Sequence, residues 1–299
     1  MRILFITSSR LGETVISCGI LEQLRTTYPK ARITIACGAN CMGLFSRLPK
    51  VHRIINVGKG NSRDFHRFRL WTKLVGRFWD IAVDVRGSEI TRFLLTGRRK
   101  VIATRKIGRR YQQFGEAMGF SPAPLPVIWT NSSDETEAER RLPAGTPIIG
   151  LGPTAGSTRK IWPPEHFIET YQAIAKVLPG CRGAIFSGTS DADRLTVAAI
   201  QARLPGTISM PAGLPLPLLG ACMSRLRLFI GNDSGLLHLA AASGAPTLGL
   251  FGRSRADEYA PAGPRAAAVA APGPPGQAPM EALTVDAVLA AVAKLLQLQ

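Results

Sequence analysis

The sequence predicts an α/β protein with two parallel-sheet domains, and three observations indicate this. Short apolar runs alternate with helix-like segments from the first residue onward, which is typical of a parallel sheet covered by helices. The alternation stops in a polar segment near residue 140 and then restarts. The 299 residues also exceed the usual size of one hydrophobic core. We therefore expect domains at 1–140 and 141–299, with the carboxyl ends of both sheets facing a shared cleft.

In the first half, five apolar runs have the length and composition of strands: 2–7, 32–37, 53–57, 81–85 and 101–104. Helix-like segments separate them. The segment NSSDETEAERRLPAG at 131–145 is polar and acidic, which is typical of a connector or of the start of an exposed helix. We place the domain boundary in this segment.

The second half begins with an apolar strand at 147–152 and a helix at 163–178 that has prolines in its first turn. Further strands are predicted at 183–187, 207–210, 227–231, 246–251 and, with a weaker pattern, 267–270. The Ala-, Pro- and Gly-rich stretch at 260–279 predicts an exposed loop. Apolar residues at helical spacing over 284–296 predict a closing helix.

Positive charge is concentrated in the first half. Residues 1–140 carry 24 Lys and Arg against 11 Asp and Glu, a net +13, whereas 141–299 carry 13 against 9, a net +4. One interpretation is a set of solvated arginines in a basic proteome. The other is a surface for phosphate, carboxylate or an anionic membrane leaflet.

The five cysteines are an odd number in a chain too long to need disulfide bonds, which indicates reduced thiols and a cytoplasmic protein. Cys37 and Cys41 lack a second Cys or His pair at zinc spacing, so no metal site is predicted. The apolar start is too short for a signal sequence, and no apolar run reaches the length of a membrane span. Any membrane contact is therefore expected to be peripheral.

A first candidate loop, SSRLGET at 8–14, follows the first strand and precedes an apolar helix. Backbone N–H groups at such a helix start point into the cleft, and Gly12 permits close approach of a ligand. Glu13 would place an acid at the mouth of the cleft. The alternative is a carboxylate that only stabilises the first turn of a helix through the helix dipole.

A second candidate loop, GPTAGSTRK at 152–160, is made of small residues and ends in two cations. It can bring N–H groups and Lys160 to a diphosphate and so stabilise a leaving nucleotide. It lacks the spacing of a P-loop. An exposed turn between a strand and a helix would have the same composition.

The third candidate segment, IGNDSGLLHLAAA at 230–242, reads as a strand that becomes a helix. Asp233 or Ser234 would be the N-cap, and the Ser234 and Gly235 amides would form an anion site at the positive end of the helix. His238 lies one helical turn further on. It is either a ligand-facing histidine or a core histidine with its hydrogen bonds satisfied.

These three loops, in this order and spacing, resemble glycosyltransferase family 9, the bacterial lipopolysaccharide heptosyltransferases. The resemblance runs nearly end to end and rests on four stretches: RILFITSSRLGE, WDIAVDVRG, STRKIWPPEHF and GNDSGLLHLAAASGAPTLGLFG. It implies the GT-B fold, in which two Rossmann-like domains face an interdomain cleft. The first would bind the acceptor and the second the nucleotide sugar.

The resemblance implies an inverting enzyme that moves a heptose or related sugar from ADP-heptose, or a similar nucleotide sugar, to an anionic lipopolysaccharide-core or lipid A-linked acceptor. Glu13 is the implied general base, at a position where the family pattern has Asp, and Lys160 is the implied catalytic cation. The expected donor-binding residues are Thr154, Ser157, Thr158, Lys160, Asp233, Ser234, Gly235, Leu236 and His238. The expected acceptor-binding residues are Ser9, Arg10, Gly12, Arg63 and Arg86.

The resemblance implies no cofactor, and the expected location is the cytoplasm with peripheral contact at the inner face of the cytoplasmic membrane. After Phe251 and Gly252 the chain departs from the family pattern with Arg253-Ser254-Arg255-Ala256, which leaves the exact donor open.

Three alternatives are compatible with single features. Gly150 to Ala155 fits G-x-G-x-x-[GA] after a strand, as in a nucleotide-dependent oxidoreductase, although Pro153 removes one amide that phosphates would use. The sequence pI near 10.6 suits a nucleic-acid-binding protein, but the Trp and Tyr residues do not interleave with the basic runs, so no nucleic acid partner is expected. The third alternative is an inactive family member, indicated by Glu13.

Overall fold

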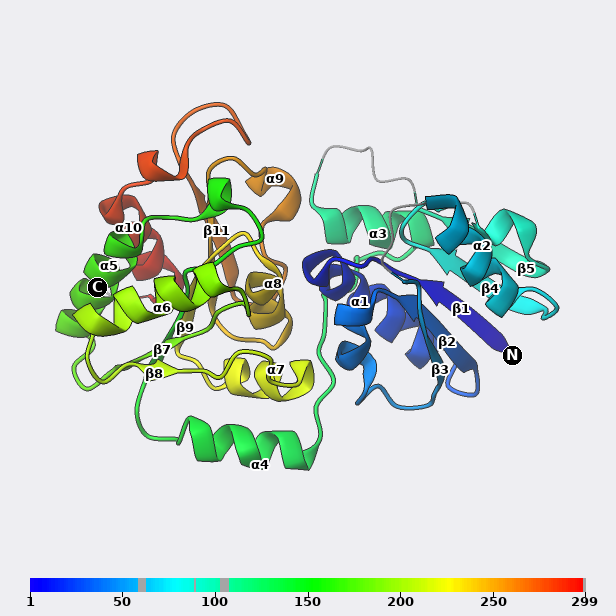
Figure 1. Cartoon of the computed structure of the whole chain (residues 1–299), viewed down its shortest axis with the longest axis horizontal. Coiled ribbons are helices and arrows are strands. Elements are labelled where there is room, and N and C mark those ends of the chain that lie inside the picture. The colour runs from blue at the N-terminus through cyan, green and yellow to red at the C-terminus, as the bar shows by residue number, and fades with distance from the viewer. Residues whose placement is uncertain (59–62, 89, 103–107, 298–299) are drawn as a thin grey trace. The chain divides into compact units, whose positions relative to one another are not determined.

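The computed structural model describes residues 1–58, 63–88, 90–102 and 108–297, and for 63–67 it describes the backbone alone. The chain divides into two compact units, Met1–Trp129 and Thr130–Gln299. Each unit is built on its own sheet of parallel strands (Figure 1). Two parallel-sheet α/β units are what the alternation of apolar runs and helix-like segments predicts.

The first unit has a five-stranded sheet in the order β3-β2-β1-β4-β5. Its strands are β1 (Arg2–Ile6), β2 (Arg32–Cys37), β3 (Val51–Asn56), β4 (Trp79–Asp84) and β5 (Thr96–Val101). The central strand β1 pairs with β2 on one side and β4 on the other, with Phe5 opposite Ile35 and Val83. Because helices cover both faces of such a sheet, Ile3 to Ile6 are completely buried.

Helical segments connect these strands: α1 (Leu11–Thr27), η1 (Ala39–Phe45), α2 (Arg63–Leu74), η2 (Ile90–Phe93) and α3 (Arg110–Met118). One core cluster of this unit gathers Leu4 and Ile6 of β1, Leu70 and Leu74 of α2, and Trp79. Helix α1 approaches the chain segment before the second unit very closely, since a Cβ on Gly19 would lie 2.5 Å from the Pro124 carbonyl oxygen.

The last strand of this sheet differs from its prediction. An apolar strand was expected at 101–104, whereas β5 spans Thr96–Val101 and carries the cations Arg98, Arg99 and Lys100. It is an edge strand, and its middle residues are exposed. Charged side chains on an edge strand prevent pairing with other chains, so hydrophobic periodicity cannot reveal such a strand.

The second unit has a six-stranded parallel sheet in the order β11-β10-β9-β6-β7-β8. Its strands are β6 (Ile148–Gly152), β7 (Arg182–Ile185), β8 (Ile208–Ser209), β9 (Leu228–Asn232), β10 (Thr247–Phe251) and β11 (Ala266–Ala270). All six lie within two residues of their predicted positions. Strands β6, β9 and β10 are buried throughout, as expected for the centre of a parallel sheet.

Helical segments of the second unit surround this sheet: α4 (Ser132–Arg141), η3 (Thr158–Lys160), α5 (Pro164–Val177), α6 (Asp191–Arg203), α7 (Leu216–Ser224), α8 (Gly235–Ala242), α9 (Ala256–Tyr259), η4 (Met280–Ala282) and α10 (Val285–Leu296). Trp162 and Phe167 are completely buried in the core against β6 and β9. No helix in the described part of the chain is long and apolar enough to cross a membrane.

The acidic segment after residue 130 forms helix α4, which belongs to the second unit. Asn131 and Asp134 form a capping box that starts the helix. Arg225, after α7, donates a 2.7 Å hydrogen bond to the Leu142 carbonyl and approaches Glu139 at 3.4 Å. The division therefore falls after Trp129, whereas the sequence placed it after residue 140 and left α4 in the first domain.

Candidate functional site

In the first unit, the loop between β1 and α1 is held in one conformation by its own side chains. Ser8 Oγ accepts a hydrogen bond from the Arg10 amide at 3.1 Å, and Thr14 Oγ1 donates to the Ser8 carbonyl at 3.0 Å. Gly38, directly after β2, makes room for this loop, because a Cβ there would lie 2.6 Å from the Ser9 Cα. The loop is therefore fixed at the carboxyl ends of β1 and β2.

This loop orients the Glu13 carboxylate. Ser8 Oγ donates a 2.6 Å hydrogen bond to Glu13 Oε2, and an Arg10 guanidinium nitrogen lies 3.6 Å from Oε1. The Glu13 side chain is 33% exposed, whereas Ser8 is buried. The carboxylate therefore reaches solvent while a buried residue holds it in place. Gly12 lies beside it in the first turn of α1.

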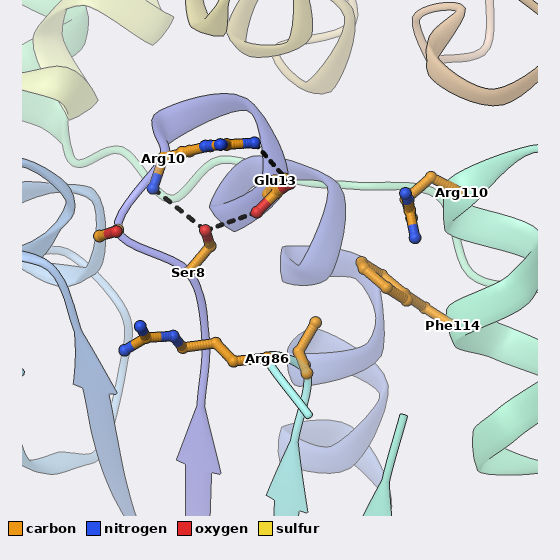
Figure 2. Close-up of a pocket in the computed structure, with 8 residues that line it drawn as sticks. Ser8, Arg10, Glu13, Arg86, Arg110 and Phe114 are labelled. Atoms are coloured by element: carbon orange, nitrogen blue, oxygen red, sulfur yellow. Dashed lines mark hydrogen bonds and ion pairs between the residues drawn. The ribbon is translucent and has the colours of Figure 1, made fainter. Parts of the chain in front are cut away.

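A cavity of about 320 Å³ opens at this carboxylate (Figure 2). Its lining residues are Ser8, Ser9, Arg10, Glu13, Val85, Arg86, Arg110 and Phe114. Three of them are arginines and one is an acid. Such a cavity combines a carboxylate able to accept a proton with cations able to hold an anionic ligand.

The loop that brings Arg86 to the cavity is shaped by a buried acid. Asp84, at the end of β4, accepts hydrogen bonds from the Arg86 amide at 3.0 Å, the Ser88 amide at 3.0 Å and the Ser88 hydroxyl at 2.5 Å. Burial raises the pKa of the Asp84 carboxyl, and these hydrogen bonds offset part of that effect. Asp84 therefore fixes the conformation of the loop, and this conformation places the exposed Arg86 at the cavity.

Sequence reasoning did not assign Arg110 and Phe114 to the site. Both project from α3 toward the cavity (Figure 2). They are four residues apart, which places them on the same face of a helix. This spacing inside a basic run was the available signal. Of the predicted acceptor-binding residues, Ser9, Arg10 and Arg86 line the cavity, whereas Arg63 begins α2 and its side chain lies outside the described residues.

In the second unit, β9 leads directly into α8, as the sequence predicts for this segment. Ser234 is the N-cap, and its side chain makes no capping hydrogen bond. The first amides of the helix are therefore not satisfied by the cap side chain, which suits an anion ligand. Ser234, Gly235 and Leu236 are partly exposed there, while His238 is buried on the next turn.

Asp233 links this helix start to the loop after β6. Lys160 Nζ lies 2.6 Å from Asp233 Oδ2, and His238 Nε2 lies 3.7 Å from Oδ1. Burial would raise the pKa of Asp233, but His238 and Lys160 outweigh it and lower that pKa to about 2. The Lys160 side chain is 36% exposed, so it can reach a ligand while Asp233 anchors it.

Two further polar residues hold this part of the second unit together. The buried Asn232 accepts a 3.1 Å hydrogen bond from the Trp162 amide, which ties the loop after Lys160 to the end of β9. Thr154 Oγ1 accepts a 3.1 Å bond from the Gly188 amide. Thr154, which we expected to bind the sugar donor, is only 3% exposed, and its hydroxyl holds the loop together. Ser157 and Thr158 are exposed beside Lys160.

The glycines that suggested an oxidoreductase have a packing role. Gly150 and Gly152 lie inside β6. A Cβ on Gly150 would lie 2.6 Å from Leu226, and one on Gly152 would lie 2.6 Å from the Phe229 ring. These glycines make room for core side chains, so they give the dinucleotide interpretation no support.

Comparison with known proteins identifies the family of this chain. Residues 67–280 match the profile described as Glycosyltransferase family 9 (heptosyltransferase). The lipooligosaccharide heptosyltransferase 2 of Haemophilus ducreyi is 25% identical over 287 residues, covering 82% of this chain and 81% of the relative. The lipopolysaccharide heptosyltransferase 2 of Salmonella typhimurium is 26% identical over 301 residues, covering 86% and 84%.

Solved structures show the same fold. A family 9 glycosyl transferase from Veillonella parvula superposes with a TM-score of 0.83 at 18% identity, covering 100% of this chain and 98% of that one. The Escherichia coli ADP-heptose lipopolysaccharide heptosyltransferase II gives 0.74 at 21% identity, with 99% of each chain covered. The GT-B fold expected from the sequence is therefore confirmed, and the nucleic-acid-binding alternative has no support. The matched region spans well over half of the chain, and the protein belongs to glycosyltransferase family 9.

Proposed function

We propose that this glycosyltransferase transfers a heptose or a related sugar, with inversion, from ADP-heptose or a similar nucleotide sugar to a hydroxyl of an anionic lipopolysaccharide-core or lipid A-linked acceptor. The observation that carries the proposal is the Glu13 carboxylate, held by Ser8 inside a cavity that three arginines line. The names of the relatives support the sugar and acceptor, and one Escherichia coli heptosyltransferase structure was solved with ADP.

In the first unit, Glu13 is the proposed general base. As the acceptor oxygen forms its bond to the anomeric carbon, Glu13 takes the hydroxyl proton, which raises the nucleophilicity of that oxygen. The bond between the anomeric carbon and the diphosphate oxygen breaks, and the electron pair leaves with ADP. Ser9, Arg10, Gly12 and Arg86 belong to the proposed acceptor region, with Arg63 as a further candidate.

In the second unit, Lys160 and the start of α8 are the proposed donor site. The Lys160 cation and the amides of Ser234 and Gly235 would stabilise the negative charge that develops on the leaving diphosphate. Ser157, Thr158, Asp233, Leu236 and His238 complete this proposed region, and the buried Thr154 supports its loop. Asp233 supports the proposal because it holds the Lys160 ammonium at 2.6 Å.

The acceptor class requires access to a membrane, and we also propose that the chain acts in the cytoplasm, in peripheral contact with the inner face of the cytoplasmic membrane. The net +13 of residues 1–140 supports this contact.

Two measurements test the proposed function. The first is a thermal-shift panel of ADP, UDP, GDP, NAD and ADP-heptose, because a ligand that binds only the folded state raises the melting temperature. We expect shifts with ADP and ADP-heptose. The second is transfer of heptose from ADP-heptose to heptose-deficient lipopolysaccharide, followed by mass spectrometry. A shift with UDP or GDP alone would contradict the donor, and ADP-heptose binding without transfer to this acceptor would contradict the acceptor.

A further inference from the structure

Large apolar side chains are exposed on one flank of the first unit, away from the cavity. Phe68 on α2 is 59% exposed, Phe93 at the end of η2 is 73% exposed, and Leu95 before β5 is 67% exposed. The labels α2 and β5 mark this flank in Figure 1. Exposed aromatic residues in a cluster are costly for a soluble surface, and such patches mark interaction sites.

These side chains form one connected surface. The rings of Phe68 and Trp71 stack with centroids 5.9 Å apart. Trp71 Nε1 donates a 3.0 Å hydrogen bond to the Phe93 carbonyl, which joins α2 to η2. Phe78 is 51% exposed and lies close to β5, since a Cβ on Gly97 would be 3.4 Å from its ring.

Cations occupy the same three elements. The exposed cations of this flank on which we rely are Lys73, Arg77, Arg98, Arg99 and Lys100. We call these residues, together with Phe68, Trp71, Phe78, Phe93 and Leu95, the basic aromatic face. Among the described residues of 68–102, the acids are Asp80 and Asp84. Asp80 accepts a 2.6 Å hydrogen bond from the Arg2 amide, and Asp84 is buried, so the described cations of this face outnumber its described exposed acids.

A nearby histidine reports the same excess of positive charge. His52 on β3 is exposed, and its pKa is lowered, first by the Arg32 charge, then by partial desolvation and next by the Arg77 charge of the face. Positive charge therefore extends from the face along the amino ends of the strands.

Protection of an edge strand explains only part of this surface. Arg98, Arg99 and Lys100 would by themselves prevent pairing along β5. Edge protection does not explain why Phe93 and Leu95 are exposed directly beside them, because apolar side chains promote association. In the folded chain Trp71 does lie among cations, which the sequence pattern did not indicate. Aromatic side chains among cations are the composition of a surface that enters the interface of an anionic bilayer.

We propose that the basic aromatic face docks on an anionic lipid bilayer. The cations attract anionic headgroups, and Phe68, Phe93 and Leu95 insert among the upper acyl chains. This inference rests on the proposed function, because a lipid-linked acceptor requires the enzyme to work at a membrane, and it names the surface that makes the contact.

The face and the cavity are separate, so they can be tested independently. Phe78 and Leu95 precede β4 and β5, whereas Val85 and Arg86 of the cavity follow β4. The six residues of β4 separate the two ends by about 20 Å. Substitutions at Phe93 and Leu95, before β5, therefore lie at the far end of the sheet from the cavity, whereas Lys100 pairs with Val83 nearer the cavity end.

The experiment measures binding of the full chain to vesicles that contain no acceptor. Vesicles of equimolar phosphatidylethanolamine and phosphatidylglycerol are compared with phosphatidylcholine vesicles, with both series repeated using brominated acyl chains. Trp79, Trp129 and Trp162 are buried, so quenching of tryptophan fluorescence by bromine reports on Trp71 of the face. We expect quenching with the anionic vesicles only.

Two double variants and one control complete the test. Phe93→Ser with Leu95→Ser is expected to weaken vesicle binding at least about tenfold, because both inserted side chains are lost. Arg77→Gln with Arg98→Gln is expected to weaken binding about tenfold at low salt. Leu195→Ser removes a side chain of the second unit that is also 73% exposed, and it should bind as the unaltered chain does.

ADP binding is measured on every preparation, which separates the two proposals. A chain that binds ADP but not anionic vesicles overturns the docking proposal and leaves the donor site standing. Vesicle binding that persists in the Phe93→Ser, Leu95→Ser variant also overturns it. Binding of an acidic protein by the face, with no binding of the vesicles, overturns it as well. Vesicle binding lost in both double variants, with ADP binding intact, supports it.

Discussion

Ser8 Oγ and Glu13 Oε2 lie 2.6 Å apart, with the hydroxyl as donor. The same oxygen accepts from the Arg10 amide, so its proton is directed at the carboxylate. Glu13 has one methylene more than the Asp of the family pattern, and a longer side chain has more rotamers. The bond from a buried serine restricts those rotamers, which explains how a glutamate can be positioned for the role we propose.

We predict that Glu13→Gln lowers kcat about 10²- to 10⁴-fold, because the amide cannot accept the proton of the acceptor hydroxyl. The affinity for ADP should stay the same, since no donor role is assigned to Glu13. Steady-state transfer kinetics and ADP titration measure the two quantities.

Glu165→Gln is the matched control, since Glu165 is an exposed acid in the first turn of α5. If Glu13 only stabilised a helix start, both variants would lower stability slightly and neither would change kcat. Equal kcat values for the two variants would therefore remove Glu13 as the base.

We predict that Ser8→Ala lowers kcat about tenfold with little change in either KM, because a hydrogen bond to a charged group is lost. Ser8→Thr keeps the hydroxyl and should restore most of the rate. In the Glu13→Gln background, Ser8→Ala should have no further effect, since Ser8 acts through the carboxylate. Additive losses in the double variant would show a role for Ser8 that is independent of Glu13.

The central parts of both sheets could be predicted from the sequence, because buried parallel strands are continuous apolar runs. Strand β5 could not be predicted, since its exposed cations carry no apolar periodicity. The same limit applies to the cavity. Glu13 and Arg86 follow strands and were found, but Arg110 enters from α3, and only the folded chain brings α3 beside the β1–α1 loop.

The residues of the proposed donor region were named from the sequence, but their contacts with one another were not. The sequence indicates a helix start at 233–235 and a cation at Lys160, yet nothing in the spacing joins residues 160 and 233. Their 2.6 Å ion pair follows from the pairing of β6 with β9, which aligns the carboxyl ends of the two strands.

We predict that Asp233 makes stability fall in acid. Its pKa is about 2 in the folded chain and about 4 in an unfolded chain, so the folded state favours the ionised form. The resulting contribution, about 2 kcal/mol, is fully present above pH about 4 and is lost as the pH falls toward 2. Urea unfolding of the native chain and of Asp233→Asn at several pH values should show the smaller acid dependence in the variant.

An Asp233→Asn variant that loses stability in acid as steeply as the native chain would contradict this. Asp191→Asn is the control, because Asp191 is exposed at the start of α6, where it pairs with Arg194. Its removal should leave the acid dependence nearly unchanged.

We predict that Lys160→Met raises the donor KM and lowers kcat, together about 10²-fold or more, because the cation that we propose stabilises the leaving diphosphate is lost. It also removes the 2.6 Å ion pair of the buried Asp233, so some stability should be lost as well. Arg159→Met removes the adjacent exposed cation and serves as the control. Equal kinetic effects of the two variants would indicate a diffuse charge effect instead of a specific contact.

We predict that Arg86→Gln raises the acceptor KM about tenfold and leaves the donor KM unchanged. The Asp84 hydrogen bonds go to the backbone and to Ser88, so the loop should keep its shape when only the guanidinium is removed. Arg86→Lys should recover part of the affinity, since it restores the charge without the two-pronged geometry. Arg227→Gln, an exposed arginine of the second unit, is the control. If Arg86→Gln and Arg227→Gln change the acceptor KM equally, the cavity is not where the anionic acceptor binds, because only a contact inside the cavity makes one arginine matter more than the other.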